Sequence, residues 1–265
     1  MKLPFQLPRN RASATLFHIV LPTISMALLV SIFWFGFSGQ QLAVDDSPGA
    51  TGGAADLTYA TKLEDGSRLR MHADRAEISH DHIAAFDIKG TIVQPDGYKR
   101  RINSKFAETG WDFQFASFGE SHILETAENG AEVDIRIKSG SANQIGLNGR
   151  DVTAEVRIGD GSRQSLVGKK LRIEFGTESA TLEGETVFFW TGHDTEDWLE
   201  ARMEGLHFNA RDSQITSMGA ADFDFEGGHG SAGLMKINVL EAKTIISVEF
   251  FEGVTISYDS PVTEL

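Results

Sequence analysis

The chain has 265 residues, no cysteine and a formal net charge of −14. The acidic balance argues against binding to nucleic acid or to anionic lipid headgroups. The absence of cysteine excludes disulfides, thiolate nucleophiles and cysteine metal sites. The length fits one large β domain or two small ones.

The N-terminal region predicts a membrane anchor. Lys2, Arg9 and Arg11 are the only charged residues before Asp45, and residues 16–37 contain no formally charged side chain. A helix of these 22 residues would rise about 33 Å, enough to cross a bilayer core of about 30 Å. Because the basic residues come first, we expect a cytoplasmic tail (1–15), a transmembrane helix (16–37) and the rest of the chain across the membrane. The alternative is a cleaved signal peptide, whose apolar region is normally shorter, about 7–15 residues.

A tether and then an all-β domain are predicted beyond this helix. Residues 38–56 are small and polar and have no periodic apolar face, which is typical of a flexible linker. From 57 to 260 short segments alternate apolar and polar residues, and turn signals such as Pro95-Asp96-Gly97 separate them. This pattern is typical of half-buried antiparallel strands, which fold over into a sandwich, a jelly roll or a slightly open barrel.

The domain also contains a loose internal repeat. An apolar or small residue recurs two places before a glycine, at Gly90, Gly119, Gly149, Gly184, Gly219 and Gly253. Successive glycines are 29, 30, 35, 35 and 34 residues apart. A period in this range predicts stacked supersecondary units that bury their apolar faces against one another.

Large aromatic residues are common on the side of these strands that we expect to be apolar. The chain has 18 phenylalanines. The candidates for the inner face are Phe86, Phe113, Phe115, Phe175, Phe208 and Phe223. One interpretation is ordinary packing in a large sandwich, and the other is an elongated apolar trough.

Three segments could carry chemistry, and each has a simpler interpretation. His80-Asp81-His82, with His72 nearby, could hold a metal but is better explained as a polar turn. The acidic segment 193–197 could act on a sugar, but a solvated loop explains it equally well. Residues 228–233 match a dinucleotide fingerprint, but the alternation that follows indicates a glycine-rich hairpin loop rather than a βαβ unit. The sequence therefore predicts no catalytic residue, metal or cofactor.

The order of the segments resembles the LptC family of the LptA/OstA-like β-jelly-roll superfamily. A basic tail, one membrane helix, a tether and a cysteine-free β domain occur in that order. Residues 66–76 resemble the opening strand of that family, a glycine followed by an apolar-x-Ala-x-x-Ala pattern. Residues 86–92 resemble its return strand, with Ile92 in place of valine. The similarity extends over about residues 57–260 and is one of strand rhythm rather than of individual side chains.

The resemblance implies a role in lipopolysaccharide export at the inner membrane. A member of this family would receive lipopolysaccharide from the LptB–LptF–LptG transporter and hold its acyl chains inside a periplasmic jelly roll. Exposed edge strands would then let an LptA-like jelly roll continue the trough by strand addition. Two alternatives from other classes remain, a structural scaffold of the envelope and a β-solenoid carbohydrate-active enzyme that uses Asp194 and Glu196.

The C-terminus predicts the edge at which a partner strand would add. Residues 244–251 and 254–258 are expected to pair as a final hairpin that turns at Glu252-Gly253. The edge residues are Val254, Ile256 and Tyr258, and Pro261 stops the strand.

Overall fold

The structure is a computed structural model that describes residues 52–62, 66–79, 81–95, 97, 99–110, 115–126, 132–143, 145–157, 161–174, 177, 179–192, 197–209, 214–239 and 245–258. The predicted tail and transmembrane helix, and residues 38–51 of the predicted tether, lie outside these residues. No helix in the described ranges is long and apolar enough to cross a membrane.

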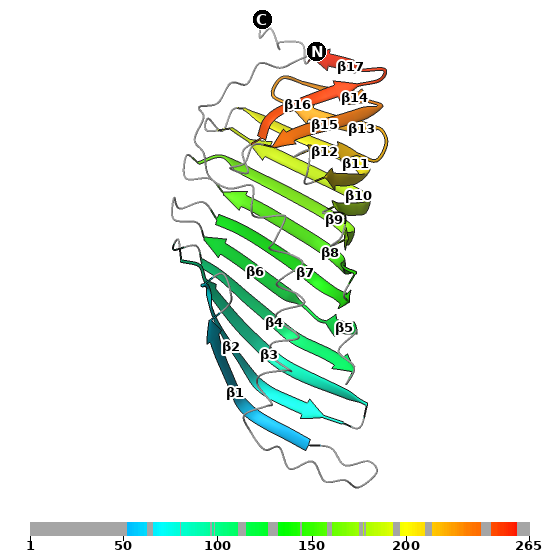
Figure 1. Cartoon of the computed structure of the whole chain (residues 1–265). Helices are drawn as coiled ribbons and strands as arrows, with labels where there is room; N and C mark the ends of the chain where they lie inside the picture. The colour runs from blue at the N-terminus through cyan, green and yellow to red at the C-terminus, as the bar shows by residue number, and fades with distance from the viewer. Residues whose placement is uncertain are drawn as a thin grey trace, which may run out of the picture.

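The described residues form one antiparallel sheet of 17 strands, as predicted for an all-β protein. The strands are β1 (Gly52–Lys62), β2 (Arg68–Ile78), β3 (His82–Val93), β4 (Lys99–Gly110), β5 (Phe115–Phe118), β6 (Ser121–Thr126), β7 (Glu132–Asn143), β8 (Gly146–Arg157), β9 (Arg163–Glu174), β10 (Ser179–Thr191), β11 (Trp198–Asn209), β12 (Gln214–Ser217), β13 (Ala221–Phe225), β14 (Gly228–Ala232), β15 (Leu234–Val239), β16 (Ile245–Phe251) and β17 (Thr255–Tyr258). Figure 1 shows them stacked in chain order, from β1 at the bottom to β17 at the top.

The first strand begins earlier than predicted. The tether was expected to extend to residue 56, but β1 begins at Gly52 and pairs with β2 from Gly52–Ile78 to Lys62–Arg68. Glycine and alanine have weak strand propensity, so this part of β1 does not look like a strand in sequence. Pairing with the strongly alternating β2 overrides that local preference.

Each row of the sheet pairs with the rows before and after it in the chain. Four rows are built from two short strands each, because β5 with β6, β12 with β13, β14 with β15, and β16 with β17 lie end to end. The 17 strands therefore make 13 rows. At about 4.8 Å for each of the twelve steps, the sheet is about 58 Å long.

A line of bends crosses the middle of these rows. Positive φ angles occur at Asp56, Asp87, Asp151, Gly184, Gly219 and Glu252. These positions are 31, 64, 33, 35 and 33 residues apart, and the long interval contains the break between β5 and β6 at Gly119. The repeat seen in the sequence is therefore a pair of antiparallel rows, with one such bend per pair. We call this line the corner.

In several rows the corner also reverses which residues face inward. In β3 the residues of the core cluster are Ile83 and Ala85 before Asp87, and Ile88 and Ile92 after it. Two consecutive residues thus face outward at the corner, and the alternation resumes with the opposite parity. The same shift occurs between Ala73 and Ala76 in β2.

Both sides of the corner contribute to one hydrophobic core. The corner divides the sheet into two halves. The half that contains β6, β13, β14 and β17 is called the first wall, and the half that contains β5, β12, β15 and β16 is called the second wall. Many inward residues of both walls are less than 10% exposed and belong to one cluster, and partly buried residues of both walls, such as Phe250, pack against it. Phe223 of the first wall stacks on Phe250 of the second with ring centroids 3.9 Å apart. The sheet therefore folds over along the corner and encloses its apolar face.

The bend at Gly184 gives a test of the corner. Its φ of 84° lies in the left-handed region, which costs about 1–2 kcal/mol for a residue with a β-carbon. We expect Gly184→Ala to lower the free energy of unfolding by that amount in urea titrations. Gly53→Ala is the control, since its β-carbon would meet only the carbonyl oxygen of Ala76, at 3.6 Å. Equal losses in both variants would contradict a special role for the bend.

Candidate functional site

The enclosed face of the sheet is mostly apolar along its described length. Near β1 its lining is mostly aliphatic, with Met71, Ile88, Ile102, Ile123 and Ile135 all buried. Further along, β7 to β11 continue it with Val152, Leu182, Phe188, Leu199 and Met203. Strand alternation places these residues on one face, and the corner keeps the two walls turned toward each other. We call this surface the interior.

The C-terminal end of the interior is aromatic. Phe223 stacks on Phe250 and lies 6.2 Å from Phe225, whose ring meets the edge of Tyr258 at 6.0 Å. Gly230 makes room for this group, because a β-carbon there would lie 2.5 Å from the ring of Phe223. Tyr258 is 67% exposed, so the aromatic group extends from the core to the last strand.

Polar contacts interrupt the apolar lining at several places, and two of them lie between β4 and β6. Arg100 of β4 and Glu125 of β6 are cross-strand neighbours, and Nε of Arg100 donates to Oε1 of Glu125 at 2.6 Å. Their side chains are 5% and 0% exposed. Closer to the corner, Ser121 donates a hydrogen bond to Ser104 at 2.9 Å. The interior of β4 and β6 thus contains a buried ion pair.

The predicted inner-face phenylalanines divide into three groups. Phe223 lies in the core at 3% exposed, and Phe208 is partly buried against it. Phe86 and Phe115 were predicted wrongly. Phe86 lies on the outer face, where the guanidinium of Arg75 is 4.3 Å from the centre of its ring, and Phe115 is 53% exposed. Phe113 and Phe175 lie outside the described residues.

The corner explains both errors. The inner residues Ile88, Gly90 and Ile92 of β3 have even numbers, and period-two extrapolation adds Phe86. The inner residues Ser121 and Ile123 of β6 have odd numbers, and the same extrapolation adds Phe115. Since the parity shifts at the corner, both extrapolations name the wrong face.

The C-terminal strands differ from the predicted hairpin. β16 pairs with β15 and β17 pairs with β14, so β16 and β17 are two halves of one row that bends at Glu252-Gly253. The predicted turn is in fact the corner, where Glu252 and Gly253 both have positive φ. Among the described residues neither strand has a partner on its other side, so this row is an edge of the sheet. β1, paired only with β2, is the opposite edge.

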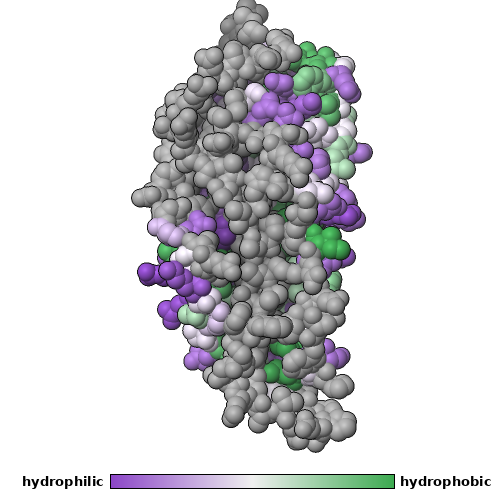
Figure 2. All heavy atoms as spheres, viewed as in Figure 1, coloured by the Kyte–Doolittle hydropathy of each residue, from purple (hydrophilic) through white to green (hydrophobic). Residues whose placement is uncertain are grey.

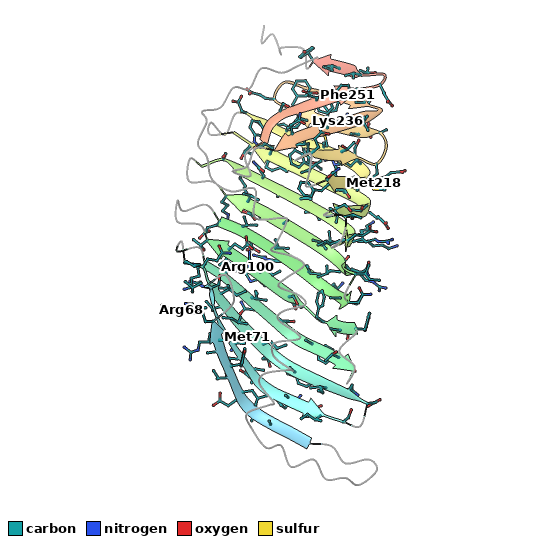
Figure 3. All side chains as sticks on the ribbon, viewed as in Figure 1. Arg68, Met71, Arg100, Met218, Lys236 and Phe251 are labelled. Atoms are coloured by element: carbon teal, nitrogen blue, oxygen red, sulfur yellow. The ribbon has the colours of Figure 1, made fainter. Side chains whose placement is uncertain are left out.

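The predicted edge residues differ in how far they are buried. Ile256 packs partly against the core, whereas Val254 precedes β17 and is 38% exposed. Phe251, at the end of β16, is also 38% exposed, and Lys236 lies 5.4 Å from the centre of its ring. Figure 3 labels both of these side chains near the upper end of the sheet. Figure 2 shows hydrophobic surface at this end, over the strands that Figure 1 labels β14 to β17.

The segments considered for chemistry have structural explanations where they are described. Ser79 and Asp81 both lie 2.8 Å from Nδ1 of His82, and His80 lies outside the described residues. No group of three possible metal ligands is found in the described part of the chain. Of the acidic segment only Asp197 is described, so Asp194 and Glu196 are not placed. Gly228–Ala232 is a strand, β14, and not the hairpin loop that we expected.

One open cavity lies on the outside of the first wall. It has a volume of about 460 Å³ and is lined by β11, β13 and β14. Arg202 crosses it, 3.3 Å from Asp224 and also paired with Glu200. Because its charged groups already bind one another, the cavity gives no separate indication of a ligand.

Ion pairs neutralise much of the outer surface. Glu155 accepts hydrogen bonds from Arg157 and Arg163, at 2.5 Å and 3.0 Å. The hydrogen bond from Arg157 is the main cause that lowers the pKa of Glu155. Lys105 pairs with Glu120, which raises the pKa of the amine and lowers that of the carboxyl group.

Comparison of the chain with protein-family models and with curated proteins found no match.

Proposed function

We propose that this protein is a membrane-anchored jelly roll of lipopolysaccharide export, which holds acyl chains in its interior and passes them to an LptA-like partner. The observation that carries the proposal is the apolar interior that continues through all 13 rows to an edge at each end. Burying one methylene contributes about 0.8 kcal/mol, so a lipid with several acyl chains needs a long apolar surface and no catalytic group. The resemblance to the LptC family supports the choice of lipid.

The proposed path follows the stack of strands. Lipopolysaccharide leaves the LptB–LptF–LptG transporter and enters between the walls near one edge. It leaves at the other edge, where an added strand of the partner extends the same apolar face. The helix predicted at 16–37 keeps the domain at the membrane surface.

The two alternative functions, a scaffold and an enzyme, predict different experimental results. An envelope scaffold would bury the same residues without binding lipid. A carbohydrate-active enzyme would depend on Asp194 and Glu196, so their replacement would abolish hydrolysis of a sugar substrate. Mass spectrometry of lipid that copurifies with the full-length protein separates the transport proposal from both.

Site-specific photo-crosslinking tests the proposal directly. We expect a crosslinker at Phe223 or Ile135 to trap lipopolysaccharide, because both side chains are buried in the interior. Asp222 and Asp134, one residue before each, are the matched controls, because strand alternation turns them to the outer face. The products are read on gels with an antibody to lipopolysaccharide.

The folding of each variant must be checked, since the reporter positions are buried. Variants with wild-type melting temperatures are compared. Equal labelling at Phe223 and Asp222 would mean adsorption to the surface and would contradict the proposal, as would labelling at the outer positions alone.

A further inference from the structure

A group of five positive charges lies on the outer face at the N-terminal end of the sheet. Its members are Lys62 of β1, Arg68 and Arg70 of β2, and Lys99 and Arg101 of β4. We call these five residues the basic patch. Figure 3 shows Arg68 clear of the sheet, and Figure 2 shows hydrophilic side chains on the left of the view, where Figure 1 places β2. The overall charge of −14 conceals this local excess.

The pairing register brings these residues together. Lys62 lies directly opposite Arg68, and Val93 of β3 lies between Arg68 and Lys99. In the next register position, Thr91 lies between Arg70 and Arg101. Four neighbouring strands span about 14 Å, so the five cations share a small area. Val93 is 38% exposed among them.

The cations of the basic patch are not neutralised by the described residues around them. Further along the same wall Arg157 and Arg163 share Glu155, and Arg136 pairs with Asp134. No described carboxylate forms an ion pair with any of the five. Like charges placed directly opposite each other, as Lys62 and Arg68 are, destabilise a sheet. This arrangement indicates an external anion.

The position of the basic patch in the chain points to the bilayer. Residues 38–51 separate the predicted membrane helix from Gly52, the start of β1. If these 14 residues form the flexible tether that the sequence predicts, they would span about 20 Å and would keep the first strands near the headgroups. Anionic lipids attract basic residues near the surface. Apolar side chains that lie beside such residues enter the boundary between headgroups and acyl chains.

We propose that the basic patch docks on anionic phospholipid headgroups and that Val93 inserts among them. This inference rests on the membrane anchor of the proposed function and adds an orientation, with the outer face of β1–β4 against the bilayer. It differs from the expectation, based on net charge, that anionic headgroups are not bound. An acidic protein surface is the competing occupant.

The absence of native cysteine permits a local probe. A polarity-sensitive dye is attached to Val93→Cys in the full-length protein, which is then reconstituted into vesicles of phosphatidylcholine alone or with 30 mol% phosphatidylglycerol. We expect a blue shift of the dye only in the anionic vesicles, reversed at 1 M salt, where the Debye length is about 3 Å. Ile145→Cys, at a site that is 75% exposed on the second wall, carries the control dye.

Charge variants test the basic patch itself. Each basic residue contributes about fivefold to attraction by an anionic surface, so Arg68→Gln, Arg70→Gln and Arg101→Gln together should lower the docking equilibrium about 100-fold. The matched triple variant, Arg136→Gln, Arg157→Gln and Arg163→Gln, removes the same charge from paired residues and should have little effect. The loop between β1 and β2 contains Glu64 and Asp65. Glu64→Gln with Asp65→Asn should strengthen docking.

The experiments distinguish failure of the docking proposal from failure of the anchor or of the carrier proposal. Equal shifts in both kinds of vesicle, or equal losses in the two triple variants, would overturn the inference. So would an unshifted dye at Val93→Cys in anionic vesicles. A protein that fails to enter vesicles would refute the anchor, and titration with anionic vesicles would then still test the basic patch. Loss of photo-crosslinking to lipopolysaccharide at Phe223 would refute the carrier proposal and leave docking unaffected.

Discussion

Replacing Glu125 with leucine is expected to lower the free energy of unfolding by about 3–5 kcal/mol, because the charge of Arg100 then remains buried without its carboxylate partner. The two side chains are 5% and 0% exposed, so water cannot solvate the remaining charge in the folded protein. Urea titration followed by tryptophan fluorescence measures the loss. Arg100→Met should have a similar effect, since it leaves the carboxylate.

The double variant separates the worth of the pair from the cost of breaking it. Arg100→Met with Glu125→Leu removes both charges and keeps much of the volume, so we expect stability at or above that of the wild type. The exposed pair between Lys105 and Glu120 is the control, and Glu120→Leu should leave the urea midpoint nearly unchanged. A double variant as unstable as the single ones would mean that the pair itself stabilises the fold.

The sequence predicted well that the fold consists of β-strands, because the alternation that identifies a strand is a local signal. Alternation within each half-row, as in Val133, Ile135 and Ile137, identifies strands without reference to the rest of the chain. The repeat was also visible, since Gly184, Gly219 and Gly253 fall on the corner. Gly90 and Gly149 do not, because Asp87 and Asp151 take the positive φ angles in those rows.

The remaining differences arise where the alternation changes phase. Asp87 in a left-handed conformation is not recognisable from residue type, and its effect extends to every residue beyond it. The faces of Phe86 and Phe115 were wrong for this reason. The same bend made the row of β16 and β17 look like a hairpin, because Glu252-Gly253 has the composition of a turn.

The buried ion pair and the basic patch were missed for a different reason. Lys99, Arg100 and Arg101 form a short basic run, which in sequence reads as a solvated segment. In the strand, Arg100 shares the inward face with Ile102, and its two neighbours face outward. Only the pairing register shows that Glu125 lies opposite Arg100 and that Arg68 lies near Lys99. Residues far apart in the sequence come together through the sheet, and their spacing does not reveal it.

The C-terminal edge should lose its partner when Ile256 is replaced with proline. The carbonyl oxygens of Thr255 and Ser257 lie against β14, each 2.5 Å from where a β-carbon of Gly230 or Gly228 would be. Because both backbone polar groups of a strand residue point to the same side, and successive residues alternate, the N–H of Ile256 faces the open edge. Proline removes that donor without breaking a bond to β14. We therefore expect Ile256→Pro to abolish capture of an LptA-like partner in pull-downs.

Two controls isolate the backbone donor in this experiment. Ile256→Ala removes the side chain that packs partly against the core but keeps the N–H, so it should retain most of the binding. Thr255→Pro removes a donor that faces β14 and should lower the melting temperature. Ile256→Pro should change the melting temperature no more than Ile256→Ala does. Capture of the partner by Ile256→Pro at the wild-type level would show that docking takes place elsewhere. The other described edge is β1, and it would then be the next strand to test.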